Sequence, residues 1–256
     1  MPIARLHDGR LLLFAHVPKC AGSAVESYLA TRFGPLAFVD TAHLSQPVGR
    51  RWSATSPQHA DMVSLRRLFP AGFLDLSFAV VRHPVARLVS AYHFQRGVEE
   101  SVPEGVNFSE WLLDLPERLA ETPFALDNHI KPMVEMVPEN AAIFHLEHGI
   151  DAIVPWLDDV TGRRDGPRAM RQVNERHGTG PKPVPSARDR TLIAKIYAAD
   201  FARFGYDSDG TAPAAPAPLL SEETLRERDA ELRRDNAPAA KLRQVAGRVA
   251  GRYLRR

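Results

Sequence analysis

The chain has 256 residues, of which 44% are hydrophobic and 25% charged, and its formal net charge is +2. This composition is typical of an ordinary soluble protein with one large domain, or one domain and an appendage. Cys20 is the only cysteine, which excludes an intrachain disulfide and fits a reducing compartment. The apolar run 11–15 is too short to span a membrane and no cleavage site follows it, so we expect a cytoplasmic protein without a signal peptide.

The positive charge is concentrated at the C-terminal end. Residues 237–256 contain six Lys or Arg and no acidic residue, so they carry +6 and the rest of the chain carries −4. A mildly acidic body gives no reason to expect nucleic-acid binding. Within this tail, residues 240–255 can form a basic amphipathic helix, which predicts contact with a membrane surface, with a protein partner or with the body of the chain.

Two continuous apolar runs, 11–16 and 76–81, predict strands buried on both faces of a parallel sheet. A third strand is expected over 141–146, and residues 35–58, which mix Pro, Gly, Ser and Thr without a period, predict loop. Helices are predicted over residues 23–33, 62–69, from Pro84 onward, 108–121, 124–136, 186–205 and 221–235. Strands that alternate with helices indicate an α/β fold with a central parallel sheet flanked by helices.

The first strand leads into Pro18-Lys19-Cys20-Ala21-Gly22-Ser23-Ala24, a tight turn followed at once by a helix. Free backbone N–H groups and the positive end of the helix dipole make such a turn an anion site. The P-loop signature of nucleotide triphosphatases is absent, because Lys19 precedes the glycine here. The plain alternative is a capped turn in which Ser23 is the N-cap and Lys19 is solvated.

A second anion site is predicted after the next strand. Arg82 stands at the C-terminal end of run 76–81, the end at which α/β sheets bind ligands. On the following helix, Arg87 and Ser90 lie opposite the apolar stripe. A guanidinium and a hydroxyl near a strand end suit a phosphate, whereas the alternative is a salt bridge of Arg82 and a solvated helix face.

Together the two stretches resemble the sulfotransferases that use 3′-phosphoadenosine 5′-phosphosulfate (PAPS), most closely the carbohydrate-type branch with heparan-sulfate 2-O-type enzymes and bacterial members. In that family a loop similar to residues 18–23 holds the 5′-phosphosulfate, and a segment similar to Val81-Arg82-His83-Pro84, Arg87-Leu88, Ser90 and Tyr92 holds the 3′-phosphate. Weaker similarity covers "QHADMVSLRRLFP", "DNHIKPMV" and "IAKIYAADFARFGYD", so the resemblance runs from about Leu11 to Asp207.

The resemblance implies a P-loop-like, three-layer α/β fold, PAPS as cosubstrate and no metal. The residues expected to bind the nucleotide are Pro18, Lys19, Cys20, Ala21, Gly22, Ser23, Ala24, Arg82, Ser90 and, in the loop before the last helix, Lys182. Cys20 stands where the family commonly has threonine. Its thiol is either a neutral space-filling group or an acidic, reactive one at a helix N-terminus.

The resemblance also assigns the general base. Of the ten histidines, His59 alone occupies the family's base position, and we expect it to take the proton of the acceptor hydroxyl while Lys19 neutralises charge on the leaving phosphate. His16 is expected to be structural, and His43 or Glu147 is the next candidate base. No pair of histidines shows metal-ligand spacing with supporting acids or cysteines.

We therefore expect a sulfotransferase domain over residues 1–210, an Ala/Pro linker over 211–220 and a charged helical tail over 221–256. The acceptor is a hydroxyl compound, carbohydrate or another small molecule, which neither composition nor motif identifies. Two alternatives of other classes stay open: a P-loop-like kinase, and a non-catalytic nucleotide-binding or scaffolding module.

Overall fold

A four-stranded sheet forms the centre of the molecule in this computed structural model, which describes residues 1–171, 181–207, 213 and 220–236. The strands lie in the order β1 (Ile3–Arg5), β2 (Leu11–Ala15), β3 (Leu76–Val81) and β4 (Ala142–His145). Strands β2, β3 and β4 are parallel, as predicted, but β1 pairs antiparallel with β2 and was not predicted. Parallel pairing places the carboxyl ends of the three longer strands at one edge of the sheet.

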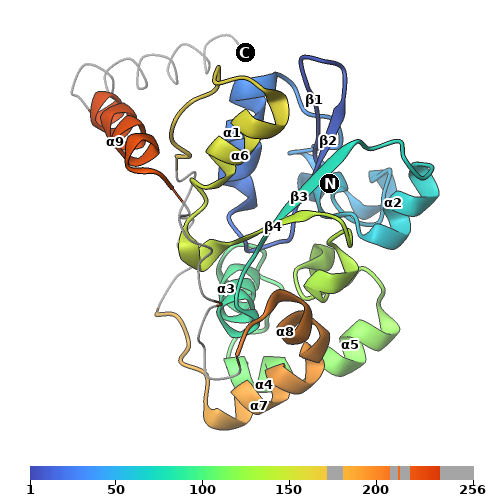
Figure 1. Cartoon of the computed structure of the whole chain (residues 1–256). Helices are drawn as coiled ribbons and strands as arrows, with labels where there is room; N and C mark the ends of the chain where they lie inside the picture. The colour runs from blue at the N-terminus through green and yellow to red at the C-terminus, as the bar shows by residue number, and fades with distance from the viewer. Residues whose placement is uncertain (172–180, 208–212, 214–219, 237–256) are drawn as a thin grey trace, which may run out of the picture.

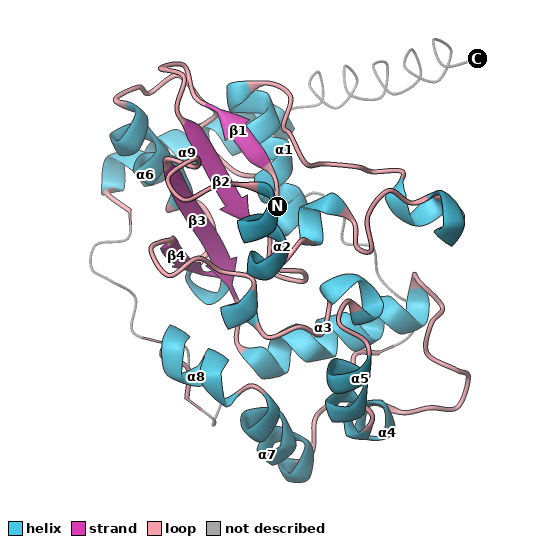
Figure 2. Cartoon of the chain, turned by 90° about the vertical axis from the view of Figure 1, so that its right-hand side faces the viewer, coloured by secondary structure: helices cyan, strands magenta, loops and turns pink. Residues whose placement is uncertain are grey.

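The helices cover the sheet on both sides and form a separate layer beyond its carboxyl edge (Figure 1, Figure 2). Their bounds are α1 Gly22–Phe33, α2 Met62–Leu68, α3 Pro84–Gly97, α4 Phe108–Leu113, α5 Leu115–Glu121, α6 Ile153–Thr161, α7 Ala187–Ile196, α8 Ala198–Phe204 and α9 Glu222–Asn236. The mixed α/β architecture predicted from the sequence is thus confirmed. None of the described helices is both long and apolar enough to cross a membrane.

Side chains alternate along each strand, so neighbouring residues lie on opposite faces of the sheet. Phe14 and Phe78 stack with ring centroids 5.0 Å apart, and Trp156 of α6 lies 5.3 Å from Phe78 on the same face. Leu13 and Ser77 point to the opposite face, next to α2. A second hydrophobic cluster, without sheet residues, joins α3, α4 and α7 through Leu88, Leu112, Ile130 and Ile193, all fully buried.

Besides β1, several segments differ from the sequence prediction, and the helix predicted over 108–121 divides at Asp114 into α4 and α5. Residues 124–136 contain only short 3-10 turns, Ala125–Asn128 and Met133–Glu135, instead of a helix. The long helix predicted over 186–205 breaks at Tyr197 into α7 and α8, although Ser186 and Asp189 form the predicted capping box. Helix α6 was not predicted. The predicted basic helix over 240–255 lies outside the described residues.

Candidate active site

A cavity of about 690 Å³ opens at the carboxyl edge of the sheet, where the loops after β2, β3 and β4 meet. Ligands bind at this edge in open α/β sheets. Most of the predicted site residues line it. The lining comprises His16, Pro18, Lys19, Ala21, Gly22, Ser23, Ala24, Glu26, Gln58, His59, Arg82, Ser90, Phe94, His129, Leu146, Gly149, Ile150, Asp151 and Met170.

The turn after β2 is strained and closely packed. Lys19 and Ala21 have left-handed φ values of 68° and 62°, which non-glycine residues rarely adopt. A Cβ atom at Gly22 would lie 1.7 Å from Nε2 of His16, so glycine is required there. Helix α1 begins at Gly22 with Ala21 at its N-cap and no side-chain cap, so the alternative in which Ser23 caps the helix is wrong.

The charge in the turn comes from Lys19, whose Nζ lies 3.9 Å from the centroid of the Phe94 ring. Burial and the neighbouring Arg82 guanidinium lower the pKa of Lys19 to about 8, which leaves it mostly protonated at neutral pH. Arg82 donates from Nη1 to the Lys19 carbonyl at 3.3 Å, so the two cations approach each other at one wall of the cavity. Ser90 of α3 lines the same cavity.

Two predicted nucleotide ligands stand apart from the others. Cys20 is 1% exposed and does not line the cavity, and burial raises the pKa of its thiol to about 12. This agrees with a neutral, space-filling role for the thiol. Lys182 is exposed and does not line the cavity either, although its charge contributes to the lowered pKa of Lys19.

Arg87 is 1% exposed, so the alternative of a solvated helix face is wrong for this residue. Its guanidinium donates to the Pro18 carbonyl and to the His129 carbonyl, both at 3.2 Å. The polar side of α3 is covered at this point by the turn after β2 and by the segment of His129, whereas α4 and α7 pack on the apolar stripe of the helix. Arg87 therefore ties the turn after β2 to the segment that carries His129.

His59 and Asp127 form a hydrogen-bonded pair beside the cavity. Nδ1 of His59 lies 2.7 Å from Oδ2 of Asp127, and Ser56 donates its hydroxyl to the same carboxylate oxygen at 2.7 Å. Burial opposes the ionised form of Asp127, but the hydrogen bonds from His59 and Ser56 outweigh it and lower the pKa of the carboxyl. An ionised Asp127 holds the proton of His59 on Nδ1 and leaves Nε2 as an acceptor.

The segment that supplies Asp127 is itself strained. Leu126, Asp127 and Asn128 have φ values of 51°, 54° and 61°, three consecutive left-handed residues without glycine. Asn128 donates its side-chain amide to the His59 carbonyl at 2.8 Å. The neighbouring Lys131 forms a buried ion pair with Asp61, the N-cap of α2, with an N–O distance of 2.5 Å. These long-range contacts, rather than local sequence, hold the turn that carries His59.

Two further histidines face the cavity, and sequence reasoning gave neither a catalytic role. Nδ1 of His16 lies 2.6 Å from Oε1 of Glu26, and burial lowers the pKa of His16 to about 4. His129 is buried, with its ring 5.2 Å from that of His59. The two residues named as alternative bases lie elsewhere: His43 does not line the cavity, and Glu147 accepts from the backbone N–H of His83 and the hydroxyl of Tyr206.

His59, Asp127 and His129 each offer one ligand atom within 4.8 Å of the others, and among the described residues they are the group that could hold a metal ion. Both histidine Nδ1 atoms already have partners: Asp127 for His59, and the Gln95 amide for His129. The observed geometry is thus that of hydrogen-bonded side chains.

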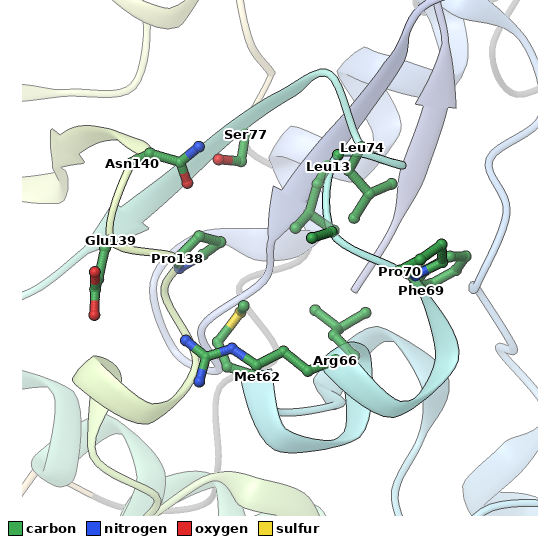
Figure 3. Close-up of a pocket in the computed structure, with 13 residues that line it drawn as sticks. Leu13, Met62, Arg66, Phe69, Pro70, Leu74, Ser77, Pro138, Glu139 and Asn140 are labelled. Carbon is green, nitrogen blue, oxygen red and sulfur yellow. The ribbon is translucent and has the colours of Figure 1, made fainter.

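A second cavity, of about 580 Å³, lies on the other face of the sheet (Figure 3). Leu13, Leu74 and Met62 give it an apolar wall, and Arg66 extends along α2 at its side. It contains neither histidine nor any residue of the two anion motifs. Of these two cavities, the first therefore holds the predicted site residues.

Comparison with known proteins gives one family. A family model described as the sulfotransferase family matches residues 5–207, which includes both anion motifs, His59 and Asp127. No curated protein and no solved structure matches the chain. Because the match covers well over half of the 256 residues, the chain belongs to the sulfotransferase family, whose members transfer sulfuryl groups.

Proposed function

We propose that the protein transfers the sulfuryl group of PAPS to the hydroxyl of a saccharide or another small acceptor. The observation that supports this proposal best is the shared cavity: the His59–Asp127 pair lines or adjoins the same space as Lys19, Arg82 and Ser90. A hydrogen-bonded histidine base and a cationic anion site in one cavity are what in-line transfer between a hydroxyl and a phosphosulfate requires.

In the proposed complex, the turn of residues 18–24 and its lysine bind the 5′-phosphosulfate, while Arg82 and Ser90 bind the 3′-phosphate. The residues present suit this division. Arg82 is half-buried and has no carboxylate partner among the described residues, so its guanidinium is available for a bidentate phosphate contact. The start of α1 adds backbone N–H groups at the first site.

The reaction consists of one displacement. The acceptor oxygen attacks sulfur, His59 Nε2 takes the hydroxyl proton, the bond between sulfur and the 5′-phosphate oxygen breaks, and adenosine 3′,5′-bisphosphate leaves. Asp127 stabilises the imidazolium that forms, because its carboxylate already accepts from Nδ1. Lys19 offsets the negative charge that develops on the leaving phosphate.

Nucleotide selectivity tests the proposal. Adenosine 3′,5′-bisphosphate should raise the Tm of the full chain much more than adenosine 5′-phosphate does, because only the bisphosphate engages Arg82 and Ser90. Arg82→Ala should abolish this difference, whereas Arg66→Ala, which changes an exposed arginine at the second cavity, should preserve it. Equal stabilisation by the two nucleotides, or turnover of ATP in place of PAPS, would reject the proposal.

The acceptor is then identified by turnover. Radiolabelled PAPS is incubated with saccharide, lipid and small phenolic acceptors, and transfer of the label is measured for each class. Preference for saccharides would place the protein in the carbohydrate-type branch. Binding of the bisphosphate without transfer to any acceptor would favour the non-catalytic alternative.

A further inference from the structure

The proposed function gives no role to His129, although this residue faces the reacting space. The side chain is 4% exposed and lines the cavity. Its ring centroid lies 5.2 Å from that of His59 and 5.0 Å from that of Phe94. Nζ of Lys19 lies over the Phe94 ring. His129 therefore packs both against the proposed base and against the aromatic ring that contacts the lysine.

A chain of hydrogen bonds from outside the cavity sets the tautomer of His129. The hydroxyl of Ser101 donates to Oε1 of Gln95 at 2.5 Å, which turns the amide nitrogen of Gln95 toward the histidine. That nitrogen, Nε2 of Gln95, donates to Nδ1 of His129 at 2.8 Å. A neutral imidazole that accepts at Nδ1 carries its proton on Nε2.

The neighbouring charges keep His129 neutral. Burial lowers its pKa well below the ordinary value, the cations Lys19 and Arg87 lower it further, and Asp127 opposes them. Arg87 also fixes the backbone, because its Nη2 donates to the His129 carbonyl at 3.2 Å. His129 is therefore a neutral donor next to His59, which Asp127 holds as an acceptor.

We propose that His129 donates its Nε2–H to an oxygen of the sulfuryl group during transfer, and that Gln95 acts as the positioning residue that keeps the proton on Nε2. The inference rests on the proposed function. No covalent bond to His129 forms or breaks, and no proton leaves it. A fixed donor in a partly buried site stabilises charge on the transferring group without reorganising as the reaction proceeds.

The tautomer is tested first, by NMR of the full chain labelled with ¹⁵N at histidine. The His129 ring should show a protonated Nε2 and an unprotonated Nδ1 across neutral pH. Addition of PAPS should shift the Nε2–H signal more than addition of adenosine 3′,5′-bisphosphate, because only PAPS carries the sulfuryl group. A proton on Nδ1, or equal shifts with the two nucleotides, would overturn the inference even in a protein for which no acceptor is known.

Kinetics then test the role. His129→Asn should lower kcat by about 10²–10³, the loss typical of one oxyanion-type donor, and leave the Kd of the bisphosphate within about twofold. His93→Ala, on the same helix as Gln95, is the matched control and should stay near wild type. Retention of more than about a tenth of wild-type kcat by a folded His129→Asn protein contradicts the proposed role.

A second variant addresses the tautomer without removing the histidine. In Gln95→Glu the new carboxylate accepts at the position where the amide donated, so the His129 proton moves to Nδ1 and the donor in the cavity is lost. The NMR signals should report this exchange, and kcat should fall nearly as far as in His129→Asn. If the His129 proton moves to Nδ1 in Gln95→Glu and kcat is unchanged, the proposed role of His129 is rejected. If the wild-type protein transfers no sulfuryl group, the proposed function is rejected instead.

Discussion

The two sides of the cavity are built in different ways. On the donor side, Lys19 lies in the turn after β2 and Arg82 directly follows β3, so the parallel sheet brings them together and short sequence motifs identify them. On the base side, His59 lies in a 3-10 turn that is held by Asp127 and Asn128, almost seventy positions along the chain. Local sequence thus encodes the proposed anion site, whereas the proposed base is positioned only by the folded chain.

The sharpest test of this division is removal of the base. His59→Ala should lose about 10²–10⁴ of the turnover, the typical contribution of a positioned base, and bind adenosine 3′,5′-bisphosphate normally. Lys19→Ala should impair both turnover and bisphosphate binding, because the lysine faces the phosphosulfate before and during transfer. His7→Ala, an exposed histidine paired with Asp165, serves as control.

Rates are measured with PAPS and the best acceptor, and Kd by calorimetry. The proposed separation of the base from the anion site is contradicted if His59→Ala keeps more than about a tenth of wild-type turnover. In that case His16, which also lines the cavity and is held by Glu26, becomes the next candidate base, in place of His43 and Glu147.

The second test concerns Asp127, which acts through His59. Asp127→Asn retains an acceptor for Nδ1–H but removes the charge that stabilises the imidazolium, so kcat should fall by at least about tenfold and by less than in His59→Ala. Binding of the bisphosphate should be unchanged. A kcat for Asp127→Glu that is well above the kcat of Asp127→Asn would show that Asp127 positions the base and is not purely structural.

The lowered pKa of Asp127 also predicts how the stability of the protein depends on pH. Its pKa is lower in the folded state than its ordinary value of 3.8, so its contribution to stability is present above that value and is lost as the pH falls below it. The Tm difference between wild type and Asp127→Asn should therefore be largest near neutral pH and shrink in acid. A difference that is independent of pH would contradict this linkage.

The same contrast explains which parts of the molecule the sequence predicts. Continuous apolar runs identify β2 and β3, and Gly22 and Pro84 mark the turns that follow them. The helix predicted over 124–136 is wrong because the contacts of Asp127 and Asn128 with the His59 turn hold their backbone in the left-handed region. Strand β1 has three residues, too few to show a period.

The candidate site follows the same rule. The segment "DNHIKPMV" contains Asp127 and His129, but its resemblance to the family does not predict the roles proposed for these two side chains. Those roles depend on which side chains face them: Ser56 and His59 for Asp127, and Gln95 for His129. No local pattern specifies contacts at such separation.

A smaller effect is expected of pH on the affinity of the donor side for the nucleotide. The pKa of Lys19 is about 8, lowered by burial and by Arg82, so the free protein loses this positive charge as the pH rises through that value. An anion prefers the protonated form, and affinity for adenosine 3′,5′-bisphosphate should decrease above pH 8. Lys19→Arg should remove this decrease, because a guanidinium stays charged. Identical pH profiles for the two proteins would show that another group is responsible.

The smallest effect is predicted for α9, which contacts the body mainly through charges. Arg164 pairs with Glu227 at 2.8 Å and Arg171 pairs with Asp235 at 2.6 Å, while Thr224 is the one buried residue among the described side chains of the helix. Exposed pairs of this kind contribute about 0–1 kcal/mol each and are screened by salt. Truncation after Asp209 should therefore lower Tm slightly in dilute buffer, spare turnover of a soluble acceptor, and lower Tm even less in high salt. A truncated chain that fails to fold would show that α9 belongs to the domain, and the predicted boundary at residue 210 would then be wrong.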